Sequence, residues 1–135
     1  MNAIFDSNIF IAIWHRGDSK KDAAIKILDT FKSEGIKNVY ITNYVLVEVI
    51  NFLLKKMNFE DLMQVYDYLT TTDRIKIIQV DKIMETGIHS LFLQYKSLSL
   101  TDCSLAALAK ELSIRNIYSF DSGFDKVKGI IRLEN

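Results

Sequence analysis

The stretch NAIFDSNIFIAIW, residues 2–14, decides the fold. Its first residues are mostly apolar and predict a short buried strand over residues 2–6. Apolar side chains then return at helical spacing, with Phe10 and Trp14 one turn apart. Asp6 lies where the strand gives way to the helix. An apolar strand followed at once by a helix is the first unit of an α/β fold.

Further strands and helices alternate along the rest of the chain. Short β-branched and aromatic runs predict strands at residues 38–42, 74–80, 116–120 and 130–133. Between them, apolar residues three or four apart predict helices around residues 25–31, 45–53, 58–72 and 102–112. This alternation is typical of helices wound around a parallel sheet.

Length and composition indicate an ordinary globular protein. At 135 residues we expect a single domain over residues 1–135. No apolar run is long enough for a membrane span, the N-terminus lacks the pattern of a signal peptide, and one cysteine cannot form a disulfide framework. We therefore expect a cytoplasmic protein with no membrane partner.

The overall charge does not indicate a nucleic-acid partner. The chain has 17 basic and 17 acidic side chains and no net charge. Basic residues gather in pairs, at residues 20–21, 55–56 and 126–128, and such pairs could follow a phosphate backbone. For any one pair, a solvated protein face is the simpler and better explanation.

Four acids stand where a carboxylate is costly or marks a strand end. Asp6 ends the first strand, Glu48 interrupts the apolar run VLVEVINFLL, Asp102 opens a helix in LSLTDCSLAALA, and Asp121 follows the strand NIYSF. In open α/β sheets, ligands bind outside the carboxyl ends of the strands, where the winding reverses. If Asn43 caps its helix, Glu48 lies roughly 7 Å along the axis from the same edge.

Four carboxylates in one cleft repel one another, and a divalent cation relieves the repulsion. Ligation by oxygen alone favours Mg²⁺ or Mn²⁺. Structural roles remain open for two of the four. Asp102 suits a helix start, where Ser99 or Thr101 could be the cap, and Asp121 suits a turn in FDSG.

At these residues the sequence resembles the PIN-domain nucleases, and among them the short VapC-type toxins of toxin-antitoxin pairs. The similar segments are IFDSNIF with Asp6, VEVINFL with Glu48, LSLTDCSLAALA with Asp102 and YSFDSGFDKV with Asp121. No single segment is specific for this family, but the order and the spacing of all four segments are. The resemblance implies a three-layer α/β/α sandwich with a central, mostly parallel five-stranded sheet.

The resemblance also implies a function. It predicts a Mg²⁺- or Mn²⁺-dependent endoribonuclease that hydrolyses RNA phosphodiester bonds, with the four acids as catalytic and metal-binding residues. An antitoxin protein and a homodimer are the partners it implies, besides the RNA substrate. Possible supporting residues around the metal are Ser7, Asn8, Ser119 and Asp125.

Two other classes of protein remain open. A phosphatase-like phosphotransferase would also place an acid after the first strand, but usually with a second acid two residues later, where this chain has Asn8. A catalytically silent module of the same fold, kept for binding protein or RNA, would not need the four acids. The lone cysteine, Cys103, is a poor nucleophile because the neighbouring carboxylate should raise its pKa.

Overall fold

The computed structural model describes all 135 residues and contains one five-stranded sheet. All neighbouring strands pair in parallel, in the order β3-β2-β1-β4-β5. The five predicted strands are confirmed, β2 with the predicted bounds and the other four shorter: β1 Asn2–Phe5, β2 Asn38–Thr42, β3 Ile75–Ile78, β4 Asn116–Tyr118 and β5 Ile131–Leu133.

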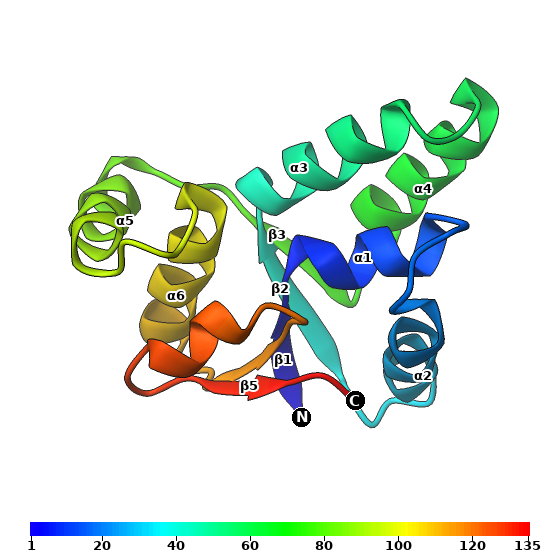
Figure 1. Ribbon diagram of the computed structural model, residues 1–135. Coiled ribbons are helices and arrows are strands. Elements are labelled where there is room, and N and C mark those ends of the chain that lie inside the picture. Colours follow the sequence, from blue (N-terminus) through cyan, green and yellow to red (C-terminus); the bar gives the residue numbers. More distant parts are fainter.

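Helices cover both faces of the sheet (Figure 1). Helices α5 and α6 lie on one side of the strands, and α1 to α4 lie on the other. The three-layer α/β/α sandwich is therefore confirmed, and its sheet is wholly parallel. The helical elements are α1 Ser7–Trp14, α2 Lys21–Lys32, α3 Asn43–Leu54, α4 Phe59–Thr71, α5 Lys82–Gln94, α6 Leu100–Leu112 and the 3₁₀ turn η1 Ser122–Lys126.

The winding of the chain reverses beside β1, the central strand. From β1 the chain moves outward to β2 and β3, then returns across the sheet to place β4 on the other side of β1. Ile4 pairs with Tyr40 of β2 on one side and with Ile117 of β4 on the other. The carboxyl ends of β1 and β4 thus flank the position where parallel α/β sheets bind ligands.

A single cluster of buried apolar side chains fills both layers between sheet and helices. The helices contribute to it at the spacing that the sequence indicates, as in α3, whose Val45, Val49 and Leu53 are fully buried. The strands β1 and β2 are apolar on both faces because helices cover them on both sides. None of the helices combines the length and apolarity needed to cross a membrane.

Two local features differ from the sequence prediction. Asn43 does not cap α3: Thr42 is the capping residue and makes no side-chain cap bond, while Asn43 Oδ1 accepts a 2.7 Å hydrogen bond from the amide of Val80. Helix α5 was not predicted at all. It buries only Met84 and Ile88 and exposes Ile83, Phe92 and Leu93, so its sequence lacks a clear amphipathic pattern.

Candidate functional site

Asp6 lies at the carboxyl end of β1 and is almost completely buried, with 2% of its surface exposed. Its amide donates to the carbonyl of Tyr118, which extends the pairing of β1 with β4 by one residue. Its carboxylate caps α1: Oδ1 accepts a 2.7 Å hydrogen bond from the amide of Ser7. Asp6 is therefore the first residue after the strand and the cap of the helix, rather than the strand's last residue.

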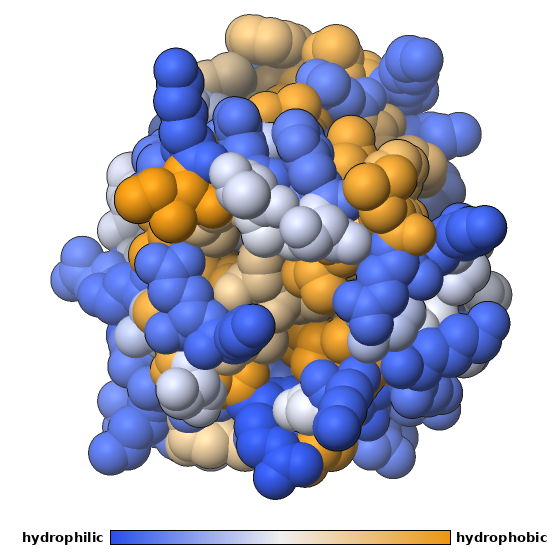
Figure 2. Space-filling model, turned by 90° about the vertical axis from the view of Figure 1, so that its left-hand side faces the viewer, coloured by the Kyte–Doolittle hydropathy of each residue, from blue (hydrophilic) through white to orange (hydrophobic).

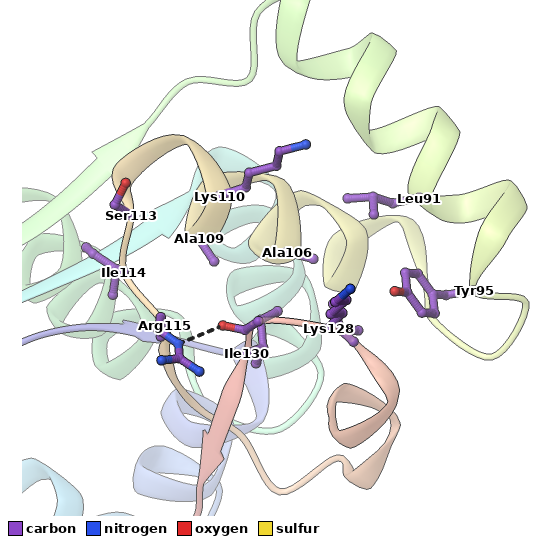
Figure 3. A pocket seen from close by; sticks show the side chains of 12 residues that line it. Leu91, Tyr95, Ala106, Ala109, Lys110, Ser113, Ile114, Arg115, Lys128 and Ile130 are labelled. Atoms are coloured by element: carbon purple, nitrogen blue, oxygen red, sulfur yellow. Dashed lines mark hydrogen bonds between the residues drawn. The ribbon is translucent and has the colours of Figure 1, made fainter.

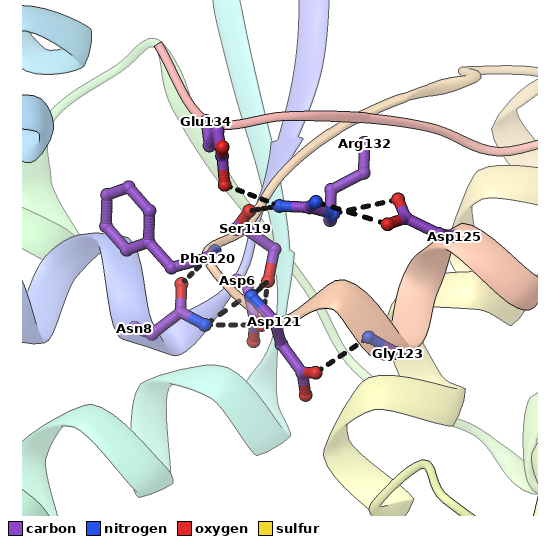
Figure 4. A network of polar contacts seen from close by, with 9 residues as sticks. All are labelled: Asp6, Asn8, Ser119, Phe120, Asp121, Gly123, Asp125, Arg132 and Glu134. Carbon is purple, nitrogen blue, oxygen red and sulfur yellow. Dashed lines mark hydrogen bonds and ion pairs between the residues drawn. The ribbon is translucent and has the colours of Figure 1, made fainter.

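The other carboxylate oxygen of Asp6 is held by two side chains (Figure 4). Oδ2 accepts hydrogen bonds of 2.7 Å from Ser119 Oγ and 3.1 Å from Asn8 Nδ2. The fully buried Ser119 hydroxyl also accepts from Asn8 Nδ2 at 3.2 Å and from the amide of Asp121 at 3.0 Å. One donor and two acceptor positions of a hydroxyl are thus all used, which fixes its orientation toward Asp6.

Glu48 reaches the same edge from α3. The helix begins directly after β2, so its second turn stands beside the end of β1. The Ser7 hydroxyl donates a hydrogen bond to Glu48 Oε1, and the Ser7 amide binds Asp6. Ser7 therefore bridges two of the four predicted acids. Unlike Asp6, Glu48 is exposed to solvent.

Asp102 lies in the first turn of α6 and is 8% exposed. It forms a capping box with Ser99: the Asp102 amide donates to Ser99 Oγ, and Asp102 Oδ2 accepts from the Ser99 amide, both at 3.1 Å. The predicted cap at Ser99 is confirmed. Asp102 does take part in capping the start of the helix, as the alternative prediction states. This contact uses Oδ2 and leaves Oδ1 without a hydrogen bond from the protein.

Asp121 follows β4 and is exposed. Its Oδ1 accepts a 2.8 Å hydrogen bond from the amide of Gly123 and so caps the turn η1. The turn role predicted as an alternative is therefore also present. The second oxygen, Oδ2, takes part in no hydrogen bond.

Asp125 is turned away from these acids (Figure 4). Its carboxylate accepts two hydrogen bonds from the Arg132 guanidinium, at 2.8 Å and 3.2 Å. Arg132 also binds Glu134 at 2.7 Å and the carbonyl of Ser119 at 3.2 Å. Asp125 is thus linked to the site only through Arg132 and the backbone of Ser119.

The four acids are close enough for their charges to affect the pKa values of Asp6 and Asp102. Burial and the charges of Asp102 and Glu48 together raise the pKa of Asp6 to about 7, although the hydrogen bonds from Ser119 and Ser7 lower it. Burial also raises the pKa of Asp102, and so do the charges of Asp121 and Glu48, while the bonds with Ser99 lower it. Neither ion pair of the chain involves these acids, since both belong to Arg132.

The thiol of Cys103 next to Asp102 is fully buried. Burial and the Asp102 charge raise its pKa to about 11, as the sequence predicts. A thiol with such a pKa stays protonated near neutral pH and is a weak nucleophile. The chemistry of the site therefore depends on its carboxylates.

The donor set fits a hard divalent cation better than any other group. Its available atoms are carboxylate oxygens without positive partners, and ligation by oxygen is what Mg²⁺ and Mn²⁺ favour. No three acids, histidines or cysteines are close enough as they stand to hold one ion. An ion held by one or two carboxylates with waters in its other positions, as Mg²⁺ often is, needs no third carboxylate.

A model of the PIN domain matches residues 3–130, nearly the whole chain. The chain belongs to the PIN domain family. The family predicted from the four acidic segments is therefore confirmed. A comparison with curated proteins finds no match.

Solved structures similar to this PIN domain share its fold at low sequence identity. VapC20 of Mycobacterium tuberculosis, a sarcin-ricin loop cleaving toxin, is 17% identical with a TM-score of 0.80 over 92% of this chain and 93% of its own. VapBC2 of Rickettsia felis, bound to a fragment of its promoter DNA, is 15% identical with a TM-score of 0.73 over 98% of each chain. A toxin-antitoxin complex from Klebsiella pneumoniae is 19% identical with a TM-score of 0.71 over 96% of each chain.

Two features of the site were not predicted from the sequence. The fully buried hydroxyls of Thr42 and Ser104 are 2.8 Å apart and join the end of β2 to α6, which carries Asp102. The other feature is the contact of Arg132 with the Ser119 carbonyl. Single hydroxyl residues and a lone arginine form no pattern in a sequence, so only a predicted contact between these elements could have revealed them.

A separate hollow of this PIN domain lies away from the acids. Figure 2 shows the side of the molecule formed by α5 and α6, where apolar atoms line a depression bordered by hydrophilic side chains. A pocket of about 490 Å³ lies there between α5, α6 and residues 127–130 (Figure 3). Its only charged lining residues are Lys110, Arg115 and Lys128, so it has no carboxylate to bind a metal ion.

Proposed function

We propose that this chain is a Mg²⁺- or Mn²⁺-dependent endoribonuclease that hydrolyses RNA phosphodiester bonds, and that it is the toxin of a type II toxin-antitoxin pair. Membership of the PIN domain family and the similarity to VapC20, a sarcin-ricin loop cleaving toxin, support the nuclease activity. The toxin role is supported by similarity to toxin-antitoxin complexes over nearly the whole chain.

One observation carries the catalytic proposal: Asp6 and Asp102 are both buried, the charge of Asp102 raises the pKa of Asp6, and neither acid has a cationic partner. Such a pair is unstable when ionised unless a cation joins it. Bound there, a divalent ion would act as a Lewis acid that makes water a nucleophile toward phosphorus near neutral pH.

The residues of the chain have separable roles in this proposal. Asp6 and Asp102 are the principal ligands, because they are buried and fixed by their capping contacts. Glu48 and Asp121 are exposed at the same edge and complete the site or orient the attacking water. The supporting side chains are Ser7, which contacts Asp6 and Glu48, and Asn8 and Ser119, which hold Asp6 Oδ2.

Protein partners are supported by apolar side chains that the fold leaves exposed. Helices α3 and α4 expose Val47, Leu54 and Phe59, with exposed fractions of 53–67%. Exposed apolar groups gathered on neighbouring helices are typical of protein interfaces. We propose that the chain forms a homodimer and that it binds an antitoxin, which would cover the acids.

Cleavage of structured RNA by the purified protein tests the nuclease proposal. The parent protein should cut with Mn²⁺ and not with a chelator, and Asp6→Asn should lower the rate at least a hundredfold. Asp67→Asn on the exposed surface of α4 is the matched control and should cut as the parent does. Cleavage by Asp6→Asn at the parent rate would refute the catalytic assignment.

The same experiment separates the two alternatives. A silent binding module is favoured by the absence of three acids placed to share an ion, and it would bind RNA without cutting it. A phosphatase would release phosphate from small esters. The position of its second acid is Asn8, whose amide is fully engaged with Asp6, Ser119 and Phe120, so the structure offers no group for that role.

A further inference from the structure

Phe120 is a partly exposed aromatic residue between two residues of the acidic site, Ser119 and Asp121. Its amide donates a 3.2 Å hydrogen bond to Asn8 Oδ1, so the same asparagine that holds Asp6 also fixes the backbone of Phe120. Figure 4 shows the ring on the Asn8 side of this network, pointing away from the Asp121 carboxylate. The backbone that carries this aromatic ring is therefore fixed next to Asp121 and next to the asparagine that holds Asp6.

Lys20 brings a positive charge to this ring. Its ammonium is 5.8 Å from the centre of the Phe120 ring, at the outer limit of a cation-π contact. Lys20 comes from the segment between α1 and α2, where its amide is fixed by a 2.8 Å hydrogen bond to Asp18 Oδ1. No acid pairs with its side chain, so the charge is free to meet an anion.

Packing alone does not account for this pair of residues. Phe120 contacts the hydrophobic core with part of its surface, but the remainder is open to solvent in an otherwise polar segment. The contact with Lys20 is long, and Lys20 is exposed, so little holds its long side chain on the ring. A planar base can then take its place on the ring, while the ammonium turns to a phosphate.

We propose that Phe120 and Lys20 form a subsite for one unpaired nucleotide beside the carboxylates, with the base stacked on Phe120 and the phosphate near Lys20. This inference rests on the proposed function and specifies its substrate class. A base inside a duplex is covered on both faces, so a stacking platform at the site requires a single-stranded segment or loop of RNA. A phenyl ring stacks with every base, so the subsite selects unpaired structure rather than sequence.

Binding of a fluorescein-labelled single-stranded oligoadenylate of ten nucleotides, measured by anisotropy with chelator present, tests the subsite without cleavage. Phe120→Leu should weaken binding about tenfold, and Phe120→Trp should retain it. The emission of the new tryptophan should be quenched by the oligonucleotide and much less by a duplex of the same length. Phe92→Leu, which changes an exposed aromatic residue of α5, should bind as the parent does.

The salt dependence of binding tests Lys20 separately. Lys20→Ala should reduce the slope of log affinity against log salt by about 0.7, the value for one phosphate contact on a single strand. Lys56→Ala is the matched control, because Lys56 lies 5.7 Å from the ring centre of Phe52 in the same kind of contact. A slope for Lys20→Ala equal to that of the parent would overturn the role of Lys20.

The results also distinguish this inference from the nuclease proposal. Parent affinity in Phe120→Leu, or equal affinity of the parent for duplex and single strand, would overturn the subsite even if Mn²⁺-dependent cleavage is found. Binding that depends on Phe120 without any cleavage would support the subsite and refute the nuclease proposal. If the parent cuts, Phe120→Leu should raise KM about tenfold with little change in kcat, as expected for lost binding.

Discussion

The Oγ of Ser119 lies 2.7 Å from Oδ2 of Asp6, so the ends of β4 and β1 are joined by side chains where the winding of the sheet reverses. Both residues are buried, and the hydrogen bond lowers the pKa of an acid whose burial raises it. The contact therefore favours the ionised carboxylate, which is the form that binds a cation.

Removal of this hydroxyl should weaken metal binding. Ser119→Ala should raise the pKa of Asp6 above its present value of about 7 and reduce affinity for Mn²⁺ about tenfold or more. Titration calorimetry at pH 7.5 measures the affinity, and the pH dependence of binding shows the shift in pKa. A structural role alone would not move that profile.

The matched variant for this test is Ser119→Thr, which keeps the hydroxyl and should retain most of the affinity. If Ser119→Ala and the parent show the same midpoint in the pH profile, the hydrogen bond does not tune Asp6.

Without metal, the free energy of unfolding should fall as pH rises. Asp6 loses its proton near pH 3.8 in the unfolded chain and near pH 7 in the folded protein, so the folded state holds the extra proton between these values. The stabilising contribution is complete below pH 3.8 and is lost as pH rises through 7. At about 1.4 kcal/mol per pKa unit it is at most about 4 kcal/mol.

Urea unfolding between pH 5 and 8, with chelator or with Mn²⁺, measures this dependence. Mn²⁺ should remove most of the decline, since it stabilises the ionised carboxylates. Asp6→Asn should flatten the curve recorded with chelator, and Asp67→Asn should leave it unchanged. A parent curve that rises over this range would contradict the raised pKa of Asp6.

The sheet could be predicted because its strands are short, apolar and separated by helices of regular period. Residues 2–5, 38–42 and 131–133 are strands close to where the sequence places them. Helix α5 was missed for a physical reason: Ile83 and Leu93 are 85% and 77% exposed, so apolar residues lie on both of its faces. The period of hydrophobicity carries no signal when a helix exposes its apolar side chains.

The acids of the site could be predicted because a carboxylate inside an apolar run is costly and needs an explanation. Their connections could not. Which oxygen of Asp6 faces Ser119, and that Ser7 joins Asp6 to Glu48, depend on contacts between residues 41 or more positions apart. The contact of Asp125 with Arg132 depends in the same way on how η1 packs beside β5.

Asp125 should matter little for cleavage. Its carboxylate is held by the Arg132 guanidinium, which lowers the pKa of Asp125 and leaves it no direct contact with the four acids. Asp125→Asn should therefore change kcat/KM for RNA by less than about threefold, well below the effect expected from loss of a metal ligand. A loss as large as that of Asp6→Asn would instead place Asp125 among the functional acids.

Asp102→Asn separates the structural role of Asp102 from its proposed metal role. Asparagine can still accept the hydrogen bond from the Ser99 amide, so the capping box is kept in the variant. The substitution removes the negative charge of Asp102, which raises the pKa of Asp6 and is itself repelled by the charges of Glu48 and Asp121. We therefore expect a midpoint of thermal unfolding a few degrees above that of the parent when a chelator is present. With saturating Mn²⁺ the order should reverse, because the parent alone gains the full binding energy of the ion.

Calorimetry of both proteins in both buffers measures this reversal of the unfolding midpoints, with Asp67→Asn as the control. A variant less stable than the parent in chelator would mean that the carboxylate of Asp102 serves the helix start and that its repulsion with the other acids is negligible.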